Sequence, residues 1–305
     1  MYPYSSCTPL CIHNKNNVYV GGHIASPDVI IDHKLKRLRM YYHCHIKDRS
    51  LFERSPGNVP GAHVFDDNQY SFVAHSSTGL SFQHYGRMLG PPYMRVFQMQ
   101  VGHIPPQYPV AKNVTFTTYY PPGHSPSTYA RLTDPTGPWY ALAKHGELLM
   151  SPNGVLKFIT LADSLAPIPR DYGDHIRHLA VYVEPEAVRP DVSVNGHSRI
   201  WVYYSLIGAA PESIHRTLFL IDNQSVWTPC MHQEILRPDM PYEGSLVGIV
   251  TSKKGEVKAA QKMHEVRDPF VFVCPAIKGR AQKNYLVYSV AGELGLGVAS
   301  IVETK

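Results

Sequence analysis

Residues 199–205 read Arg-Ile-Trp-Val-Tyr-Tyr-Ser, and stretches of the same kind occur twice more in the chain. Residues 37–43 read Arg-Leu-Arg-Met-Tyr-Tyr-His, and residues 283–289 read Lys-Asn-Tyr-Leu-Val-Tyr-Ser. Each begins with a basic residue, continues through apolar and aromatic residues, and ends on a polar one. Because aromatic residues are enriched in strands, we interpret the three stretches as copies of one aromatic strand in a repeated unit.

Two other patterns accompany this strand. The first is a tight turn that opens a further strand, at residues 76–82 (Ser-Ser-Thr-Gly-Leu-Ser-Phe), at 151–158 (Ser-Pro-Asn-Gly-Val-Leu-Lys-Phe) and, more weakly, at 251–257. The glycine of each turn can adopt a positive φ, which hairpin turns require. The second pattern is a short apolar strand with acids or polar residues at its ends, found at residues 28–32, 63–67 and 268–273.

Together these units predict a strand, a polar turn, the aromatic strand, a glycine turn and an outer strand, which is the order within a propeller blade. Dividing the chain by five gives about 61 residues per blade, enough for four short strands and their loops. The sequence therefore predicts one five-bladed domain over residues 1–305, with a long face loop at about 106–138. A two-sheet sandwich is the competing architecture. The approximate blades are 18–60, 61–105, 136–175, 176–230 and 240–303.

Composition supports an all-β fold. The 305 residues include 22 Gly and 26 Pro, and only 17% are charged, so few runs suit a long helix. The net charge of +5 is spread along the chain, and we interpret the short basic cluster at 34–39 as a hairpin turn rather than a nucleic-acid site. We see no signal peptide and no apolar run long enough for a membrane span. Five cysteines without zinc-type spacing favour reduced thiols, and we expect a cytoplasmic protein.

The C-terminal segment carries a resemblance to a known family. It reads Val-Arg-Asp-Pro-Phe-Val-Phe at residues 266–272, followed by Tyr-Leu-Val-Tyr-Ser at 285–289 and by the glycine-rich stretch 291–299. This resembles blades of the five-bladed β-propeller glycoside hydrolases, the arabinanase/β-xylosidase and invertase/levansucrase superfamily. In those enzymes Arg-Asp-Pro introduces the innermost strand and its Asp projects into a central funnel. Ser26–Asp32, the Ser-x-x-Gly turns and Tyr242-Glu-Gly244 are similar to other parts of the same superfamily.

The resemblance implies carboxyl groups as catalysts. Cleavage of a glycosidic bond needs one carboxylic acid to protonate the leaving oxygen and an ionised carboxylate to activate water or attack the sugar. We assign Glu243 as general acid, Asp28 as base or nucleophile, and Asp268 as the residue that holds the substrate and raises its neighbour's pKa. The families place the first-blade Asp directly before Pro, whereas here Ser26 precedes Pro27 and the acid follows at Asp28. Glu212 is a reserve candidate for the acid.

Other side chains could hold a carbohydrate substrate, because Arg and His hydrogen-bond sugar hydroxyls and Trp can stack on a sugar face. Trp139 could equally pack between blades, as we expect for Trp201. His43 and His45 share one face of a strand, where a polar strand end is preferred to a metal site. The substrate-binding candidates are His23, His75, Trp139, Arg177, His178 and Arg267.

We therefore expect a glycosidase that hydrolyses O-glycosidic bonds and needs no cofactor or catalytic metal, although a structural ion on the propeller axis would be compatible with the fold. One alternative is a propeller that binds a glycan or a protein without catalysis, since propellers support many functions. Another is a glycoside phosphorylase or transferase on the same fold, for which Arg177, His178 and Arg267 would suit a phosphate. We expect no nucleic-acid partner and no membrane partner.

Overall fold

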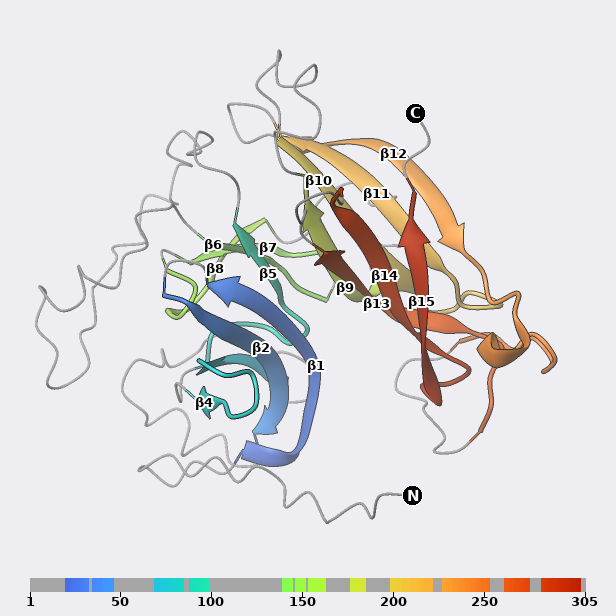
Figure 1. Cartoon of the computed structure of the whole chain (residues 1–305), viewed down its shortest axis with the longest axis horizontal. Helices are drawn as coiled ribbons and strands as arrows, with labels where there is room; N and C mark the ends of the chain where they lie inside the picture. Colours follow the sequence, from blue (N-terminus) through green and yellow to red (C-terminus); the bar gives the residue numbers. More distant parts are fainter. Residues whose placement is uncertain are drawn as a thin grey trace, which may run out of the picture. The chain divides into compact units, whose positions relative to one another are not determined.

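A computed structural model describes a little over half of the chain (Figure 1). The described residues are 20–32, 35–46, 69–84, 88–98, 139–144, 146–151, 153–162, 176–184, 198–221, 227–252, 261–274 and 281–302. The expected face loop and the segments at 63–67 and 253–257 lie outside these ranges. Among the described residues, no helix is long or apolar enough to cross a membrane.

The described residues form strands and one short 3-10 helix, η5 (Pro241–Glu243), which confirms the all-β expectation. The first strands are β1 (Val20–Asp32), β2 (Arg37–Ile46), β3 (Gln69–Ser76), β4 (Gln83–His84), β5 (Arg95–Gln98), β6 (Trp139–Leu142), β7 (Leu148–Ser151) and β8 (Ile159–Ala162). The later strands are β9 (Ile176–Val183), β10 (Ser198–Leu206), β11 (Ile214–Ile221), β12 (Trp227–Leu236), β13 (Val266–Cys274), β14 (Lys283–Val290) and β15 (Gly295–Ile301).

These strands form four sheets in which neighbours follow one another along the chain: β1-β2-β3-β4, β5-β6-β7-β8, β9-β10-β11-β12 and β13-β14-β15. The up-and-down order agrees with the expected order within a blade, and the described residues form four sheets where a sandwich would have two. The predicted boundary at residue 60 is wrong, because β2 pairs with β3 across it. The predicted blade 176–230 agrees closely with the sheet β9–β12. Five blades around one axis stay a prediction.

The aromatic repeat occupies the same place in three sheets. Its copies form β2, β10 and β14, which are each the second strand of their sheet. The glycine turns follow the third strands β3 and β7, so one more strand lies between the aromatic strand and the turn than the sequence suggested. Gly79 and Gly154 have φ values of 79° and 72°. In both turns the preceding serine hydroxyl accepts a hydrogen bond from the glycine N–H, at 2.8 Å for Ser76 and 3.1 Å for Ser151.

The chain divides into two compact units, which are described separately. Unit 1 contains residues 1–96, 109–141 and 149–159, and unit 2 contains 97–108, 142–148 and 160–305. In unit 2 the sheets β9–β12 and β13–β15 share an apolar cluster, in which Trp201, Tyr203, Leu218, Leu286 and Tyr288 are each at most 4% exposed. Figure 1 draws these sheets in yellow to red. Burial of such large side chains is the main stabilising contribution to a β core.

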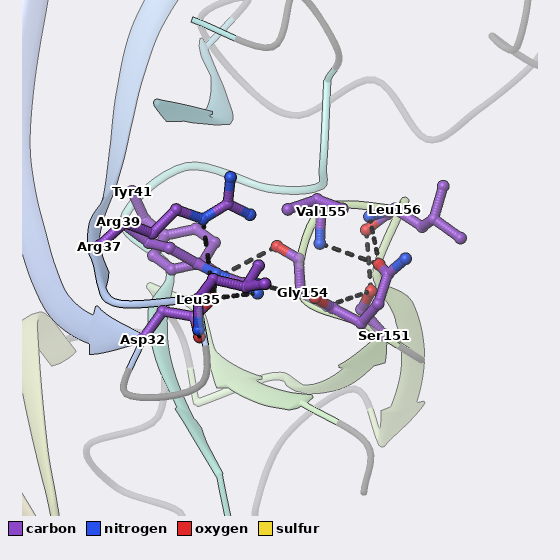
Figure 2. Close-up of polar contacts among 10 residues, drawn as sticks. Asp32, Leu35, Arg37, Arg39, Tyr41, Ser151, Gly154, Val155 and Leu156 are labelled. Carbon is purple, nitrogen blue, oxygen red and sulfur yellow. Dashed lines mark hydrogen bonds and ion pairs between the residues drawn. The ribbon is translucent and has the colours of Figure 1, made fainter. Parts of the chain in front are cut away.

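Unit 1 contains a buried polar cluster around Arg39 (Figure 2). The Arg39 guanidinium donates from Nε and Nη2 to Oδ2 of Asp32, at 2.8 and 2.6 Å. Its Nη1 donates to the carbonyl oxygen of Asn153 at 2.7 Å, and Tyr41 donates from its hydroxyl to the carbonyl of Gly154 at 2.9 Å. These bonds hold the turn after β7 against β2. The other carboxylate oxygen of Asp32 accepts a hydrogen bond from the N–H of Leu35 at 2.9 Å.

Candidate functional site

A β-bulge recurs at the same place in the first strands of three sheets. Ser26 in β1, His178 in β9 and Asp268 in β13 are non-glycine residues with φ near 50°. At each of them three residue steps of the first strand oppose two of the second, which is the signature of one inserted residue. The residues opposite the three bulges are tyrosines of the aromatic repeat, which explains part of the repetition: Tyr42, Tyr204 and Tyr288.

The bulge fixes which side chains occupy equivalent positions. Asp268 corresponds to His178 in β9 and to Ser26 in β1, whereas Asp28 lies two residues further along its strand. A non-glycine residue at positive φ costs about 1–3 kcal/mol and tends to occur at functional sites. The equivalence therefore directs attention to His178 and Asp268, which both belong to unit 2.

His178 and Asp268 contact each other. The Nδ1 atom of His178 faces Oδ1 of Asp268 in an ion-pair geometry, and the two side chains are 14% and 26% exposed. The sequence predicted Asp268 as a catalytic residue and His178 as a substrate-binding residue, in separate predicted blades. The structure brings them together from β9 and β13, which belong to neighbouring sheets with a shared core.

Each member of this pair directly follows a buried arginine. Arg177 is 6% exposed and its Nη1 lies 3.4 Å from Oε2 of Glu212, a residue with no exposed surface. The other carboxylate oxygen of Glu212 accepts a hydrogen bond from the hydroxyl of Ser205 at 2.7 Å. Because a buried charge is stable only when it is paired, Arg177 and Glu212 depend on each other.

Arg267 connects three carboxylates. Its Nη1 lies 3.3 Å from Oε1 of Glu265, its Nη2 donates to Oε1 of Glu293 at 2.7 Å, and its Nε lies 3.8 Å from Oδ2 of Asp268. Glu265 and Arg267 are each 2% exposed. Burial is the main cause that raises the pKa of Glu265. The nearby carboxylates Glu212 and Glu293 raise it further, and Arg267 opposes the shift.

The cluster as a whole contains more acids than bases. Four carboxylates, Glu212, Glu265, Asp268 and Glu293, surround the two guanidinium groups of Arg177 and Arg267. Backbone contacts join the Arg177–Glu212 pair to the group around Arg267. Glu212 and Glu265 form a parallel bridge, and the N–H of Val266 donates to the carbonyl of Glu212 at 3.1 Å. Both arginines already have carboxylate partners. The cluster therefore suits a ligand with hydroxyl groups or a positive charge, and it suits a negatively charged ligand poorly.

Glu243 has a structural environment. It is 2% exposed and ends η5, where its Oε2 accepts from the N–H of Met240 at 3.0 Å. Its Oε1 accepts from the hydroxyl of Tyr288 at 2.7 Å. Both carboxylate oxygens accept hydrogen bonds within the protein, so these contacts indicate that Glu243 caps η5. Its assignment as general acid stays a prediction that these contacts do not favour.

Asp28 belongs to unit 1 and is also buried, at 8% exposure. Its Oδ2 accepts from the N–H of Val96 at 2.9 Å. Burial raises the pKa of Asp28, and the nearby Arg95 guanidinium opposes that shift. Arg95 itself donates to the carbonyl of Ser26 at 3.0 Å. The bulge thus supplies a reason for the displaced acid: Ser26 occupies the strained position, and Asp28 is stabilised behind it.

The remaining predicted ligand residues lie in unit 1. Trp139 is 2% exposed, and the Arg39 guanidinium carbon lies 4.4 Å from its ring centroid. Trp139 therefore packs in the interior, which was the alternative to stacking on a sugar. Burial, followed by the charge of Arg37, lowers the pKa of His75. His23 is in β1, and its side chain is outside the description.

Sequence reasoning missed Glu265, Glu293 and Ser205 and kept Glu212 only in reserve. Glu265 had one available signal, since it precedes Val-Arg-Asp-Pro directly in the sequence. The expected core role of Trp201 is confirmed: it is 4% exposed and its Nε1 donates to Glu184. Among the described residues, no group of three or more His, Cys, Asp and Glu side chains is arranged to hold a metal ion.

The chain is similar in sequence to a viral protein. No family model matches the chain. It is 27% identical over 293 residues to a protein of Acanthamoeba polyphaga mimivirus that is described only as uncharacterized. The match covers 91% of this chain and 61% of the viral protein, so the chain spans less than two thirds of that relative's length.

Solved structures with some likeness include carbohydrate complexes. A GH62 hydrolase bound to xylotriose aligns with 96% of this chain and 72% of its own, with a TM-score of 0.40 and 9% identity. A mutant of the Aleuria aurantia lectin bound to α-methyl-L-fucoside aligns with 92% of this chain and 78% of its own, with a TM-score of 0.34 and 9% identity. Both TM-scores are below 0.5.

Proposed function

We propose that unit 2 binds a carbohydrate at the His178–Asp268 pair. The observation that carries this proposal is the contrast in exposure within one cluster. Arg177, Glu212, Glu265 and Arg267 are almost completely buried, while the Asp268 side chain keeps 26% of its surface accessible. The buried charged residues would then stabilise the positions of His178 and Asp268, and these two side chains would contact the ligand.

The charge balance supports a neutral, hydroxyl-rich ligand. Carboxylates accept hydrogen bonds from hydroxyl groups, and charged hydrogen bonds of this kind are among the stronger polar contacts. A phosphate or a uronic acid would need an unpaired cation, whereas Arg177 and Arg267 are each paired with buried glutamates. The arrangement therefore favours glycan binding or hydrolysis over phosphorolysis.

The test is binding of the purified chain to a glycan array, followed by calorimetry on the strongest hit. Asp268→Asn should weaken binding by about tenfold or more, since it removes a charged hydrogen-bond acceptor. Asparagine tolerates positive φ, so the bulge should survive the change. Asp239→Asn, an exposed acid in the same unit, is the control and should bind normally. Equal affinity of Asp268→Asn and the wild type would refute this proposal.

A second candidate function is hydrolysis of the glycosidic bond, and it is favoured by one further observation. Glu265 and Asp268 both contact Arg267, at 3.3 and 3.8 Å. Since guanidinium nitrogens are only ~2.3 Å apart, the two contacting carboxylate oxygens are separated by at most about 9.4 Å, an upper limit that is compatible with glycosidase acid pairs. The raised pKa of Glu265 suits a proton donor.

A panel of aryl glycosides and oligosaccharides tests this second function. Asp268→Asn and Glu265→Gln should each abolish turnover, while Glu243→Gln should retain it if Glu243 is a capping residue. Loss of turnover in Glu243→Gln with folding and glycan binding unchanged would restore the original assignment of Glu243 as general acid. Glycan binding without any turnover would favour a binding protein.

A further inference from the structure

His178 lies between two ion-pair systems, one beside it on its own strand and one beside Asp268 on β13. On its own strand it follows Arg177, which is fixed by Glu212. From β13 it meets Asp268, which follows Arg267, and Arg267 is fixed by Glu265 and Glu293. Both contacting residues have positive φ at equivalent bulges, so neither is placed by an ordinary strand geometry. Two ion-pair systems with buried arginines thus flank one partly exposed contact.

The two ring nitrogens of His178 have different environments. Nδ1 is buried and faces Oδ1 of Asp268, while the side chain as a whole is 14% exposed. The accessible part of the ring therefore excludes Nδ1. A carboxylate that accepts from Nδ1–H fixes the tautomer, and a proton exchanged with a ligand would then be carried on Nε2. The carboxylate also stabilises the imidazolium ion that forms when Nε2 is protonated.

We propose that His178 and Asp268 form an acid–base dyad, in which His178 exchanges a proton with a hydroxyl group of the bound ligand and Asp268 positions it. This inference rests on the carbohydrate site proposed above and adds a proton-transfer role to it. The proton leaves the hydroxyl oxygen for Nε2, the resulting imidazolium is balanced by the Asp268 carboxylate, and the proton returns to the oxygen on release. Asp268 is then a positioning residue with respect to the proton.

The charged groups around the dyad come from several elements. Arg177 is beside His178 on β9 and Arg267 is beside Asp268 on β13, and both would disfavour a further positive charge. Glu212, Glu265 and Glu293 offset them from the segments after β10, before β13 and after β14. With the arginines paired in this way, Asp268 is the carboxylate in direct contact with the imidazole.

The test is a nitrogen-15 NMR titration of the histidine rings in the full chain, with His178 assigned by its loss in His178→Asn. In the wild type we expect the neutral ring of His178 to carry its proton on Nδ1. Asp268→Asn should lower the pKa of His178 by about one unit or more, because a carboxylate within ion-pair distance shifts a neighbour by roughly 1–3 units. Asp239→Asn should leave the pKa of His178 unchanged.

A wild-type ring with its proton on Nε2, or a pKa that is the same in Asp268→Asn, would overturn the dyad. The tautomer measurement does not need Asp268→Asn, so it remains decisive even if that variant unfolds. No ligand is needed either, which separates the two proposals. If Asp268→Asn loses glycan binding but leaves the pKa of His178 unchanged, the dyad is refuted and the carbohydrate site stands. If the dyad is confirmed and the wild type binds no glycan, the carbohydrate proposal is refuted.

Discussion

Replacement of Gly154 by alanine tests the packing of the turn after β7. Gly154 has a φ of 72°, and a Cβ atom added there would lie 2.8 Å from Nη1 of Arg39, 2.8 Å from the hydroxyl oxygen of Tyr41 and 2.9 Å from Cδ2 of Trp139. These neighbours have little room to move. Arg39 is bonded to Asp32 and to the carbonyl of Asn153, Tyr41 is bonded to the carbonyl of Gly154, and Trp139 is buried under Arg39.

The expected loss of unfolding free energy has two parts. A left-handed backbone costs a non-glycine residue about 1–2 kcal/mol. Overpacking of a close-packed interior adds roughly 1–3 kcal/mol. Gly154→Ala should therefore destabilise unit 1 by about 2–5 kcal/mol in total, the sum of these two contributions.

Gly79→Ala is the matched control. Gly79 stands at the same position of the equivalent turn in the same unit, with φ of 79°. A Cβ there would lie 3.2 Å from Cδ1 of Leu38, the flexible end of one side chain. Its cost should stay near the backbone contribution alone, about 1–2 kcal/mol.

Urea unfolding of both variants, with hydrogen exchange of β2 and β7 to localise the effect, measures the difference. We expect Gly154→Ala to unfold at the lower denaturant concentration and to lose protection first around Arg39. If Gly79→Ala were destabilised as much as Gly154→Ala, the steric explanation would be refuted, and backbone conformation alone would account for both.

Two further predictions concern single side chains. Glu243 accepts hydrogen bonds from the N–H of Met240 and the hydroxyl of Tyr288, and Glu243→Gln keeps an acceptor for only one of them. The substitution should therefore lower the free energy of unfolding in urea by about 1–3 kcal/mol without changing glycan affinity. An unchanged stability would contradict the capping role. Burial lowers the pKa of His84 to about 4, below its unfolded value of about 6.5, so the unfolded state takes up the proton first. The free energy of unfolding should therefore fall by about 1–3 kcal/mol between pH 6.5 and 4, and His84→Gln should flatten that part of the stability curve; identical curves for both proteins would contradict this.

The aromatic repeat shows how far a single sequence can predict this fold. Its three copies are β2, β10 and β14, and the tyrosine of each copy opposes a bulge in the first strand. The residue types predicted a strand, because large aromatic side chains fit the pleated, half-buried surface of a sheet. They did not show that β3 pairs with β2, and β4 with β3, rather than starting a new sheet. Pairing depends on which strands meet after the chain has folded, and residues 47–68 separate β2 from β3 in the sequence.

The candidate site shows the same division. Arg267 and Asp268 were identifiable from a local motif, and so were Arg177 and His178 at the start of an apolar strand. Glu265 was not, and Glu212 was only a reserve candidate, because an isolated glutamate near a turn is usually a solvated residue. The folded chain buries both and brings them beside the arginines, where burial without a partner would be costly.

The sequence by itself determined that this protein is built from strands, which stretches form the repeated aromatic strands, and which glycines open turns. Those features are local, since they follow from side-chain shape and from the φ angles that glycine permits. Only the tertiary structure decided which acid occupies a bulge, that Glu243 caps η5, and that His178 meets Asp268. Those outcomes depend on contacts between residues distant in the chain, whose energies exist only once the sheets have packed.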